Sequence, residues 1–320
     1  MSIVVTEYTA TKKTEWDAFV RQSNNGTLFH LQDFLAYHPE DRFMFHHLMF
    51  YRDNKLLCVL PGGKKGRSFI SPTGASYGGF VTRPFTNYTT MESIVQSFIS
   101  HCKDMEIENI HITPPMQIYN SIFDEVVEYA LLYNKFTCSN SLYSSIIDLS
   151  RIRSRADLAK TPRYCVNKAE RAGVQIMESD NYSQAYDMLV ENKKKFQTTP
   201  THSLEELIYL HNHFPQSIKL FLACHERKPI AGQWIFLTNS NCALIFYSMH
   251  LYEYRNLYSL NLLLEHVIKW VGEKGFRYLD YGVSADTFHS DPMEPSRSLV
   301  RFKESVGCTG CLRKTYTLTL

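Results

Sequence analysis

The chain has 320 residues, more than one ordinary domain core holds, so we expect about two domains. Hydrophobic residues make up 44% of it and aromatic residues 13%, which is typical of a well-filled globular interior and excludes a disordered chain. A formal net charge of only +2 argues against extensive nucleic-acid binding, and we expect no DNA partner. No segment has the apolar length of a signal peptide or of a transmembrane helix. We therefore expect a cytoplasmic protein without membrane insertion.

The first half of the chain predicts a strand, two helices, a hairpin and then alternating helices and strands. Thr14, with Asp17 three residues later, is typical of a helix start. Asp53 and Asn54 separate two apolar runs and predict a tight turn. The predicted strands are 3–9, 43–52, 55–61, 109–113 and 142–149, and the later helices are 31–38, 90–105 and 121–132.

The segment 68–82 predicts a strand that carries Tyr77, Gly78 and Gly79. Glycines let a ligand approach the backbone closely, so these three residues are candidate substrate contacts. Glycine bulges with a purely structural purpose are at least as common.

The second half repeats the order of the first. Its predicted strands are 173–178, 218–225, 230–238, 241–251, 276–284 and a terminal pair over 311–319; its helices are 183–196, 203–214, 258–274 and 296–306. The charged segment 150–163 marks the boundary, so we expect domains 1–150 and 151–320. This order predicts a duplicated α/β (α+β) plan, in which each domain has a mixed, largely antiparallel sheet flanked by helices.

The stretch from 244 to 284 organises the second half. An aromatic strand is broken at 252–256, and Gly275 ends the helix that follows it. The apolar residues of this helix recur at three- and four-residue spacing, and they are Leu262, Leu263, Val267, Ile268 and Val271. A second strand follows, as in a parallel β-α-β unit, whose exposed helix N-terminal amides suit an anionic group.

This order of elements resembles the GNAT superfamily of N-acetyltransferases, and its duplication is similar to the Fem family of peptidoglycan aminoacyltransferases and their acetyltransferase-like relatives. Three stretches carry the resemblance: TPRYCVNKAERAGVQI (161–176), FRYLDYGVS (276–284) and SLVRFKESVG (298–307). Their order and spacing are more specific than any one of them. The resemblance covers nearly the whole chain and implies an acyltransferase of two tandem GNAT-like domains, with the transfer site in the second.

GNAT enzymes hold the pyrophosphate of acyl-CoA in a loop of the form Arg/Gln-x-x-Gly-x-Gly/Ala before a helix. The segment that resembles this loop consists of Arg255, Asn256, Leu257, Tyr258, Ser259 and Leu260. The resemblance implies that residues 255–259 bind the donor, acetyl-CoA or another acyl-CoA. Both small positions are replaced here, and a tyrosine in place of glycine crowds a pyrophosphate.

Acyl transfer to an amine needs an anchored donor, a neutral amine and charge stabilisation at the tetrahedral centre. The resemblance implies that Lys303, in the Phe-Lys motif, supplies the stabilising charge; the alternative is a solvated helix lysine. Asp280 and Tyr247 are candidates for accepting or relaying the amine proton, and Asp280 has a loop cap as its alternative. Tyr281 and Ser284 are candidate substrate contacts at the strand end, where alternation places Asp280 and Tyr281 on opposite faces.

Two donors compete. Arg163 and Lys168, with Arg171, predict a basic face that could meet a phosphate-bearing donor or acceptor, although solvated helix faces are more frequent. Together with Arg151, Arg153 and Arg155 they form the nearest candidate surface for an aminoacyl-tRNA. The nearly balanced charge favours acyl-CoA, with the amine of a small molecule or cell-envelope precursor as acceptor. A non-catalytic binding module is the second alternative, because the Tyr258 ring could occupy the donor cleft.

We expect no metal site. The histidines that we considered offer no i, i+4 pair with a third ligand; they are His30, His38, His46, His47, His211 and His213. Cys308 and Cys311 have the spacing of a redox or zinc pair, but they follow a helix and lack a second pair.

Overall fold

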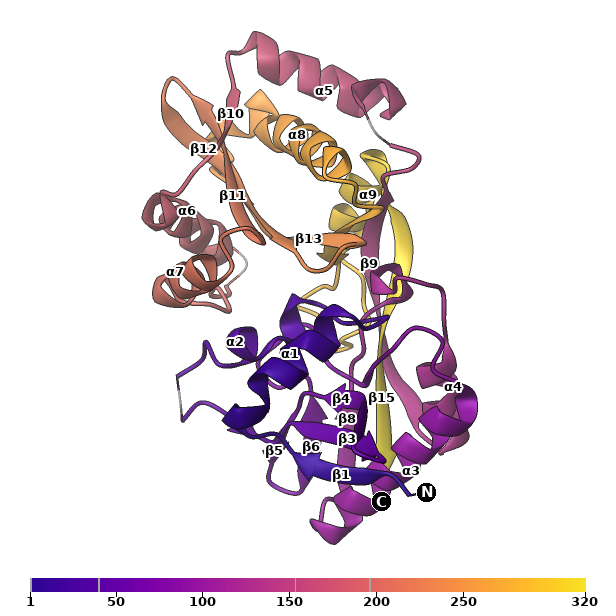
Figure 1. Ribbon diagram of the computed structural model, residues 1–320. Coiled ribbons are helices and arrows are strands. Elements are labelled where there is room, and N and C mark those ends of the chain that lie inside the picture. The colour runs from indigo at the N-terminus through magenta and orange to yellow at the C-terminus, as the bar shows by residue number, and fades with distance from the viewer. Residues whose placement is uncertain (1, 40, 153, 196) are drawn as a thin grey trace. The chain divides into compact units, whose positions relative to one another are not determined.

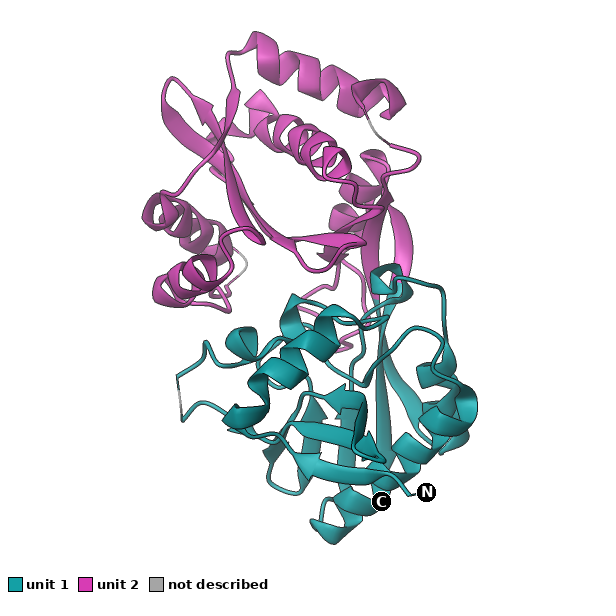
Figure 2. Cartoon of the chain, viewed as in Figure 1, with its two compact units in different colours: residues 1–142, 312–320 teal, residues 143–311 magenta. Residues whose placement is uncertain are grey.

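The computed structural model describes residues 2–39, 41–152, 154–195 and 197–320, and Figure 1 shows the course of the chain. The chain divides into two compact units, Met1–Leu142 with Leu312–Leu320 and Tyr143–Cys311 (Figure 2). We refer to them as unit 1 and unit 2. Two long strands, β9 (Thr137–Asp148) and β15 (Thr309–Thr319), contribute residues to both units.

The described residues of unit 1 form two sets of hydrogen-bonded strands and four α-helices. The strand order is β1-β3-β4-β7 in the first set and β15-β8-β6-β5-β2 in the second. The strands besides β9 and β15 are β1 (Val4–Glu7), β2 (Met44–Phe45), β3 (Leu48–Arg52), β4 (Lys55–Leu60), β5 (Gly63–Lys65), β6 (Ser68–Ser71), β7 (Val81–Thr82) and β8 (Asn109–Ile112). The α-helices are α1 (Lys13–Arg21), α2 (Gln32–Leu35), α3 (Tyr88–Asp104) and α4 (Val126–Tyr133), with short 3-10 turns at Ala10–Lys12, Leu28–His30 and Gln117–Tyr119.

The hairpin between β3 and β4 confirms the predicted turn. Asp53 and Asn54 have φ angles of 52° and 60°, the left-handed pair that a two-residue hairpin turn of type I′ requires. The two strands pair antiparallel from Leu48↔Leu60 to Arg52↔Lys55. Asn and Asp tolerate this backbone region better than most residues, which is why the sequence signal is strong.

Two expectations for unit 1 are wrong. Thr14 does not cap a helix, because a 3-10 turn leads directly into α1 at Lys13. Asp17 instead faces inward and accepts a hydrogen bond from the Gln32 backbone N–H at 2.9 Å, which fixes the start of α2. The segment 68–82 is not one strand: β6 ends at Ser71, β7 begins at Val81, and Tyr77 to Gly79 lie in the loop between them.

Unit 2 is a six-stranded mixed sheet with helices packed against it. The strand order is β10-β11-β12-β13-β14-β9. The remaining strands are β10 (Gln175–Glu178), β11 (Ile218–His225), β12 (Lys228–Leu237), β13 (Cys242–His250) and β14 (Tyr278–Val283). The helices are α5 (Lys160–Arg171), α6 (Tyr182–Lys194), α7 (Leu204–His213), α8 (Ser259–Glu273) and α9 (Arg297–Ser305), with 3-10 turns at Arg155–Asp157 and η5 (Tyr252–Leu257).

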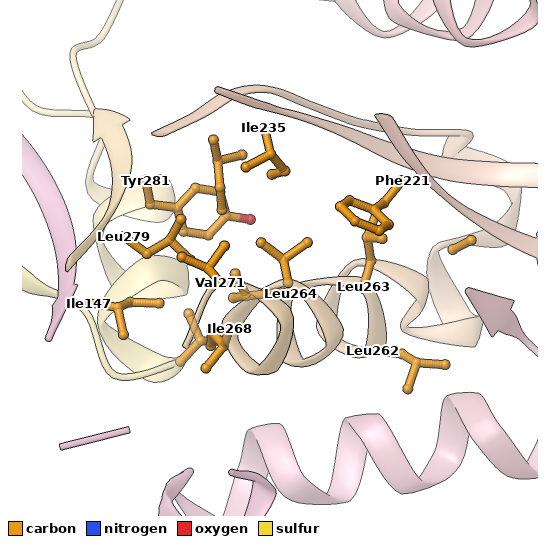
Figure 3. Close-up of a cluster of buried hydrophobic side chains, with 14 of the residues drawn as sticks. Ile147, Phe221, Ile235, Leu262, Leu263, Leu264, Ile268, Val271, Leu279 and Tyr281 are labelled. Atoms are coloured by element: carbon orange, nitrogen blue, oxygen red, sulfur yellow. The ribbon is translucent and has the colours of Figure 1, made fainter. Parts of the chain in front are cut away.

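Helix α8 carries the core of unit 2. The five apolar residues predicted to form its inner face are all buried, and Leu263, Val267 and Val271 are 0% exposed. Figure 3 shows Leu263 and Leu264 beneath the sheet side chains Phe221 and Ile235, while Leu262 lies on the opposite side of the helix. Gly275 has a φ of 86° just beyond the helix, as a glycine that ends a helix requires. The predicted parallel β-α-β unit is confirmed, since β13 pairs parallel with β14.

Three expectations for unit 2 need correction. Residues 311–319 do not form a strand pair, because β15 runs unbroken from Thr309 to Thr319 and pairs with β8. Residues 252–257 are a 3-10 helix rather than an irregular break. The predicted helix 183–196 ends at Lys194, and Phe196 lies outside the described residues.

None of the helices in the described ranges combines the length and the apolar character that crossing a bilayer requires.

Candidate functional site

The site in unit 2 begins where two parallel strands stop pairing. The register of β13 and β14 runs from Cys242↔Tyr278 to Leu244↔Asp280, yet β13 continues to His250 and β14 to Val283. In the same region β13 contains one extra residue, Phe246, opposite β12, because Trp234 pairs with Tyr247 and Ile235 with Ile245. Beyond Leu244 and Asp280, the backbone N–H and C=O groups of β13 and β14 therefore no longer pair with each other.

Lys303 of α9 is buried at the end of β14. Lys303 is 3% exposed, and its ammonium donates hydrogen bonds to the carbonyls of Gly282 (2.8 Å) and Val283 (3.2 Å). Burial lowers the pKa of Lys303 to about 8, and the nearby charge of Asp280 opposes part of this shift. The interpretation as a solvated helix lysine is thereby excluded. A cation poised near neutral pH is a recurrent feature of functional sites.

Asp280 shapes the backbone that holds Lys303. The carboxylate is 0% exposed, and its Oδ1 accepts hydrogen bonds from the Ser144 hydroxyl at 2.9 Å and the Gly282 N–H at 2.7 Å. Gly282 has a φ of 75°, a conformation that favours glycine. Asp280 therefore fixes the turn whose carbonyls bind the Lys303 ammonium.

Tyr281 joins Lys303 to a second polar group. The Lys303 ammonium lies 5.2 Å from the centre of the Tyr281 ring. The Tyr281 hydroxyl accepts a hydrogen bond from the Gln233 side chain at 3.3 Å, and Gln233 also donates to Ser248 at 3.2 Å. Burial raises the pKa of Tyr281 to about 12, so the hydroxyl is protonated at neutral pH. The sequence analysis did not single out Gln233 or Ser248, although a glutamine inside the apolar run of β12 is a signal that could have found them.

Neither Ser284 nor Tyr247 takes part in the contacts that join Lys303, Asp280 and Tyr281. Ser284 is 1% exposed just beyond β14, and its backbone N–H donates to the Tyr143 carbonyl at 3.0 Å. Tyr247 is directly opposite Trp234 and so faces the other side of the sheet from Gln233. Its hydroxyl accepts from the backbone N–H groups of Thr201 and His202 at 3.2 and 3.3 Å. The structure therefore gathers Lys303, Asp280 and Tyr281, but not Tyr247.

The segment 255–259 forms the entry to α8. Tyr258 is the N-cap residue, with a left-handed φ of 54° and no capping hydrogen bond from its side chain. Glycine adopts this conformation most readily, so the tyrosine backbone is strained here. The GNAT loop that this segment resembles has a glycine at the same position. The Lys168 ammonium lies 4.9 Å from the Tyr258 ring, and the Arg255 guanidinium lies 4.2 Å from the Tyr252 ring. Two cations thus flank the N-terminus of α8.

The basic face of α5 is only partly available for binding. Arg163, Lys168 and Arg171 are exposed. Arg155 binds Glu170 through two nitrogens, at 2.7 and 2.6 Å, and that pair raises the pKa of Arg155 above its ordinary value. Arg153, part of the candidate tRNA surface, lies outside the described residues.

Tyr77, Gly78 and Gly79 belong to unit 1, where internal packing accounts for them. Tyr77 is 3% exposed, and a side chain at Gly78 would collide with Ser71 and with the Pro72 backbone. The Gly79 N–H donates to the Ser71 hydroxyl at 2.8 Å. Their role as substrate contacts stays a prediction.

In the part of the chain that the structure describes, no group of three or more His, Cys, Asp or Glu side chains is arranged to hold a metal ion. Cys308 is a buried free thiol. Burial raises the pKa of Cys308 to about 12, so this thiol is uncharged at neutral pH and is a poor nucleophile.

Comparison with known proteins gives one family match and several structural ones. Residues 156–290 match the model of the acetyltransferase (GNAT) domain. No curated protein sequence matches the chain.

Solved structures resemble the chain over nearly its full length. FemX has a TM-score of 0.71 at 13% identity, covering 99% of this chain and 97% of FemX. The C-terminal domain of a putative lysylphosphatidylglycerol synthetase from Agrobacterium fabrum has a TM-score of 0.63 at 11% identity, covering 97% and 92%. A tandem GNAT protein from the clavulanic acid biosynthesis pathway has a TM-score of 0.57 at 9% identity, covering 99% and 98%.

The family match supports acyl transfer as the general class of reaction. Residues 156–290, which lie within unit 2, thus match the acetyltransferase (GNAT) domain, and the chain as a whole has a fold like that of FemX and of the tandem GNAT protein.

Proposed function

We propose that the protein transfers an acyl group from an acyl-CoA to the amine of a small molecule or cell-envelope precursor. The observation that carries this proposal is the buried Lys303 ammonium beside the diverging ends of β13 and β14. Two of its three N–H groups donate to the Gly282 and Val283 carbonyls, which leaves one N–H for a substrate oxygen.

The chemistry needs little else from the protein. The neutral amine attacks the thioester carbonyl carbon, and the negative charge that develops on the carbonyl oxygen is stabilised by the Lys303 ammonium. The C–S bond then breaks, and the leaving thiolate takes up the proton that the amine has lost. No covalent enzyme intermediate is formed, in keeping with the uncharged Cys308 thiol. Asp280 acts as a positioning residue that holds the turn at Gly282.

The donor phosphates have a suitable partner at the N-terminus of α8. The amides of the first helical turn carry partial positive charge, and the Tyr258 side chain does not cap them. Lys168 and Arg255 add two full charges nearby. The Tyr258 ring lies against the Lys168 ammonium of α5, which favours an enzyme over a binding module with a blocked donor cleft.

An aminoacyl-tRNA donor is the second candidate. The specific observation is the strained Tyr258 where a compact pyrophosphate loop needs a glycine, together with the exposed cations of α5. The similarity to FemX in fold is compatible with this reading. A tRNA would release many counterions on binding, so its affinity would fall steeply with salt concentration.

Turnover separates these possibilities. We expect the full chain to release free CoA thiol from acetyl-CoA or a longer acyl-CoA in the presence of an amine mixture, and we expect isothermal titration to show binding of the same thioester. A salt-dependent complex with aminoacylated tRNA, without any binding of CoA thioesters, would contradict the acyl-CoA donor and favour the second candidate. Absence of both activities, with stable binding of a sugar or peptide, would favour the binding module.

Replacing Asp280 with asparagine should shift the pH dependence of transfer. The amide keeps an oxygen for Ser144 and Gly282 but removes the negative charge that supports the Lys303 cation. The pKa of Lys303 should fall below its value of about 8, so the alkaline loss of activity moves to lower pH. At pH 8.5 we expect roughly tenfold lower kcat/KM, since loss of a nearby opposite charge shifts a pKa by about one unit or more.

The matched control for this prediction is Asp291→Asn, at an exposed position of unit 2. A pH profile of kcat/KM that is identical for the Asp280→Asn and wild-type proteins would contradict the coupling between Asp280 and Lys303.

A further inference from the structure

The amide of Gln233 is buried with one of its ends unpaired. Gln233 is 0% exposed in the middle of β12, directly opposite Ser248 of β13. Its Nε2 donates to the Ser248 hydroxyl at 3.2 Å and to the Tyr281 hydroxyl at 3.3 Å. Its Oε1 has no hydrogen-bond partner among the described residues.

Turning the amide over does not remove the problem. Hydroxyl groups donate as well as accept, so Ser248 and Tyr281 could equally bond to Oε1, and the NH₂ group would then be unpaired. In either orientation one polar end of a fully buried amide lacks a partner, which is unfavourable for the folded protein. An unpaired group of this kind is expected where a ligand supplies the missing partner.

The position of Gln233 points to the reacting end of the ligand. Its two partners come from the two strands that have stopped pairing, Ser248 from β13 and Tyr281 from β14. The Tyr281 ring is also the contact of the Lys303 ammonium, and Figure 3 shows this ring beside Leu279 at the edge of the apolar cluster. Ser248, one of the two partners of the amide, is partly exposed.

We propose that Gln233 determines acyl specificity by hydrogen bonding to a hydroxyl or amino group on the transferred acyl chain. This inference rests on the proposed acyl transfer. An unsubstituted alkyl chain would cover the amide and leave its end unpaired, so the site selects a short polar acyl group over an alkyl group of the same length.

The first test compares two thioesters that differ by one hydroxyl, butyryl-CoA and 3-hydroxybutyryl-CoA. We expect wild-type kcat/KM to favour the hydroxylated donor by about 10- to 100-fold. Gln233→Met has nearly the same shape, and we expect it to bring this ratio close to one by raising KM for the hydroxylated donor, while Gln233→Glu retains a preference. An unchanged ratio in Gln233→Met overturns the inference. If neither thioester is consumed by the wild-type protein, the acyl-CoA proposal fails, and the second test decides on Gln233.

The second test needs no turnover. Asn25 is a buried amide with both ends paired: its Nδ2 donates to the Phe80 carbonyl at 2.8 Å and its Oδ1 accepts from the Thr82 N–H at 3.0 Å. Asn25→Leu should lower the urea midpoint of unfolding. Gln233→Met should leave the midpoint unchanged or raise it, because Ser248 and Tyr281 already lie within hydrogen-bonding reach of each other and remain paired without the amide. If Gln233→Met lowered the urea midpoint as much as Asn25→Leu, an ordered water would be the partner of the unpaired Gln233 atom, and its role would be structural. That result would overturn the inference.

Discussion

Lys303→Ala should lower kcat/KM for acyl transfer by about 10²- to 10³-fold, the usual effect of removing one preorganised group that stabilises an oxyanion. The effect should be large because the ammonium is buried, where its charge is weakly screened, and because two backbone carbonyls fix its position. The same group predicts a pH profile. The pKa of Lys303 is about 8, so the cationic fraction and the activity should fall as pH rises through about 8. Lys303→Arg, if active, should lose this alkaline limb, because a guanidinium stays charged.

Two variants separate catalysis from folding. Arg301→Ala removes an exposed cation from the same helix and should retain wild-type activity. Lys303→Met keeps the buried alkyl chain without the charge, and it should be as inactive as Lys303→Ala while its circular dichroism and urea midpoint show a folded protein. Full turnover by Lys303→Met on an identified substrate would remove Lys303 from the mechanism.

Leu263→Ala should reduce the free energy of unfolding by about 2 to 5 kcal/mol, the range for a fully buried leucine. Leu263 is 0% exposed and lies on the inner face of α8, whose N-terminus carries the segment 255–259 (Figure 3). The lost contacts and the cavity left behind both contribute. Urea unfolding followed by tryptophan fluorescence measures the effect, since two of the three tryptophans, Trp234 and Trp270, belong to unit 2.

Leu299→Ala is the matched control, because this leucine is 38% exposed on α9 and its truncation should cost much less. Equal losses of stability in the two variants would show that α8 does not carry the core of unit 2.

The sequence predicts best where a local pattern and the tertiary structure require the same residues. The apolar spacing of α8 follows directly from one buried helix face, and Asp53-Asn54 directly specifies a left-handed turn. It predicts poorly where a side chain serves a distant partner. Asp17 looks like part of a helix start, but its carboxylate binds the Gln32 backbone. Patterns of neighbouring residues cannot predict this hydrogen bond, because Gln32 lies 15 residues away in the sequence.

The same distinction applies to the site. The strand-end and Phe-Lys patterns led to Asp280 and Lys303, which the structure brings to one turn at Gly282. Tyr247 stands on the adjacent strand, but one extra residue in β13 affects which face each side chain takes, and such a bulge leaves no clear trace in the sequence. Gln233 stands out in the sequence as a glutamine inside an apolar run, but that its side chain has an unpaired atom is visible only in the three-dimensional contacts.

Strand β15 has a consequence for the order in which the protein is made. Tyr316 of this strand is 1% exposed within the core of unit 1 and pairs with Ile112, although all of unit 2 separates it in sequence from the rest of unit 1. During translation, unit 2 leaves the ribosome before the first-made unit can complete its sheet. Nascent unit 1 therefore has an unpaired β8 edge during that interval, and at this edge pairing with another chain competes with native folding.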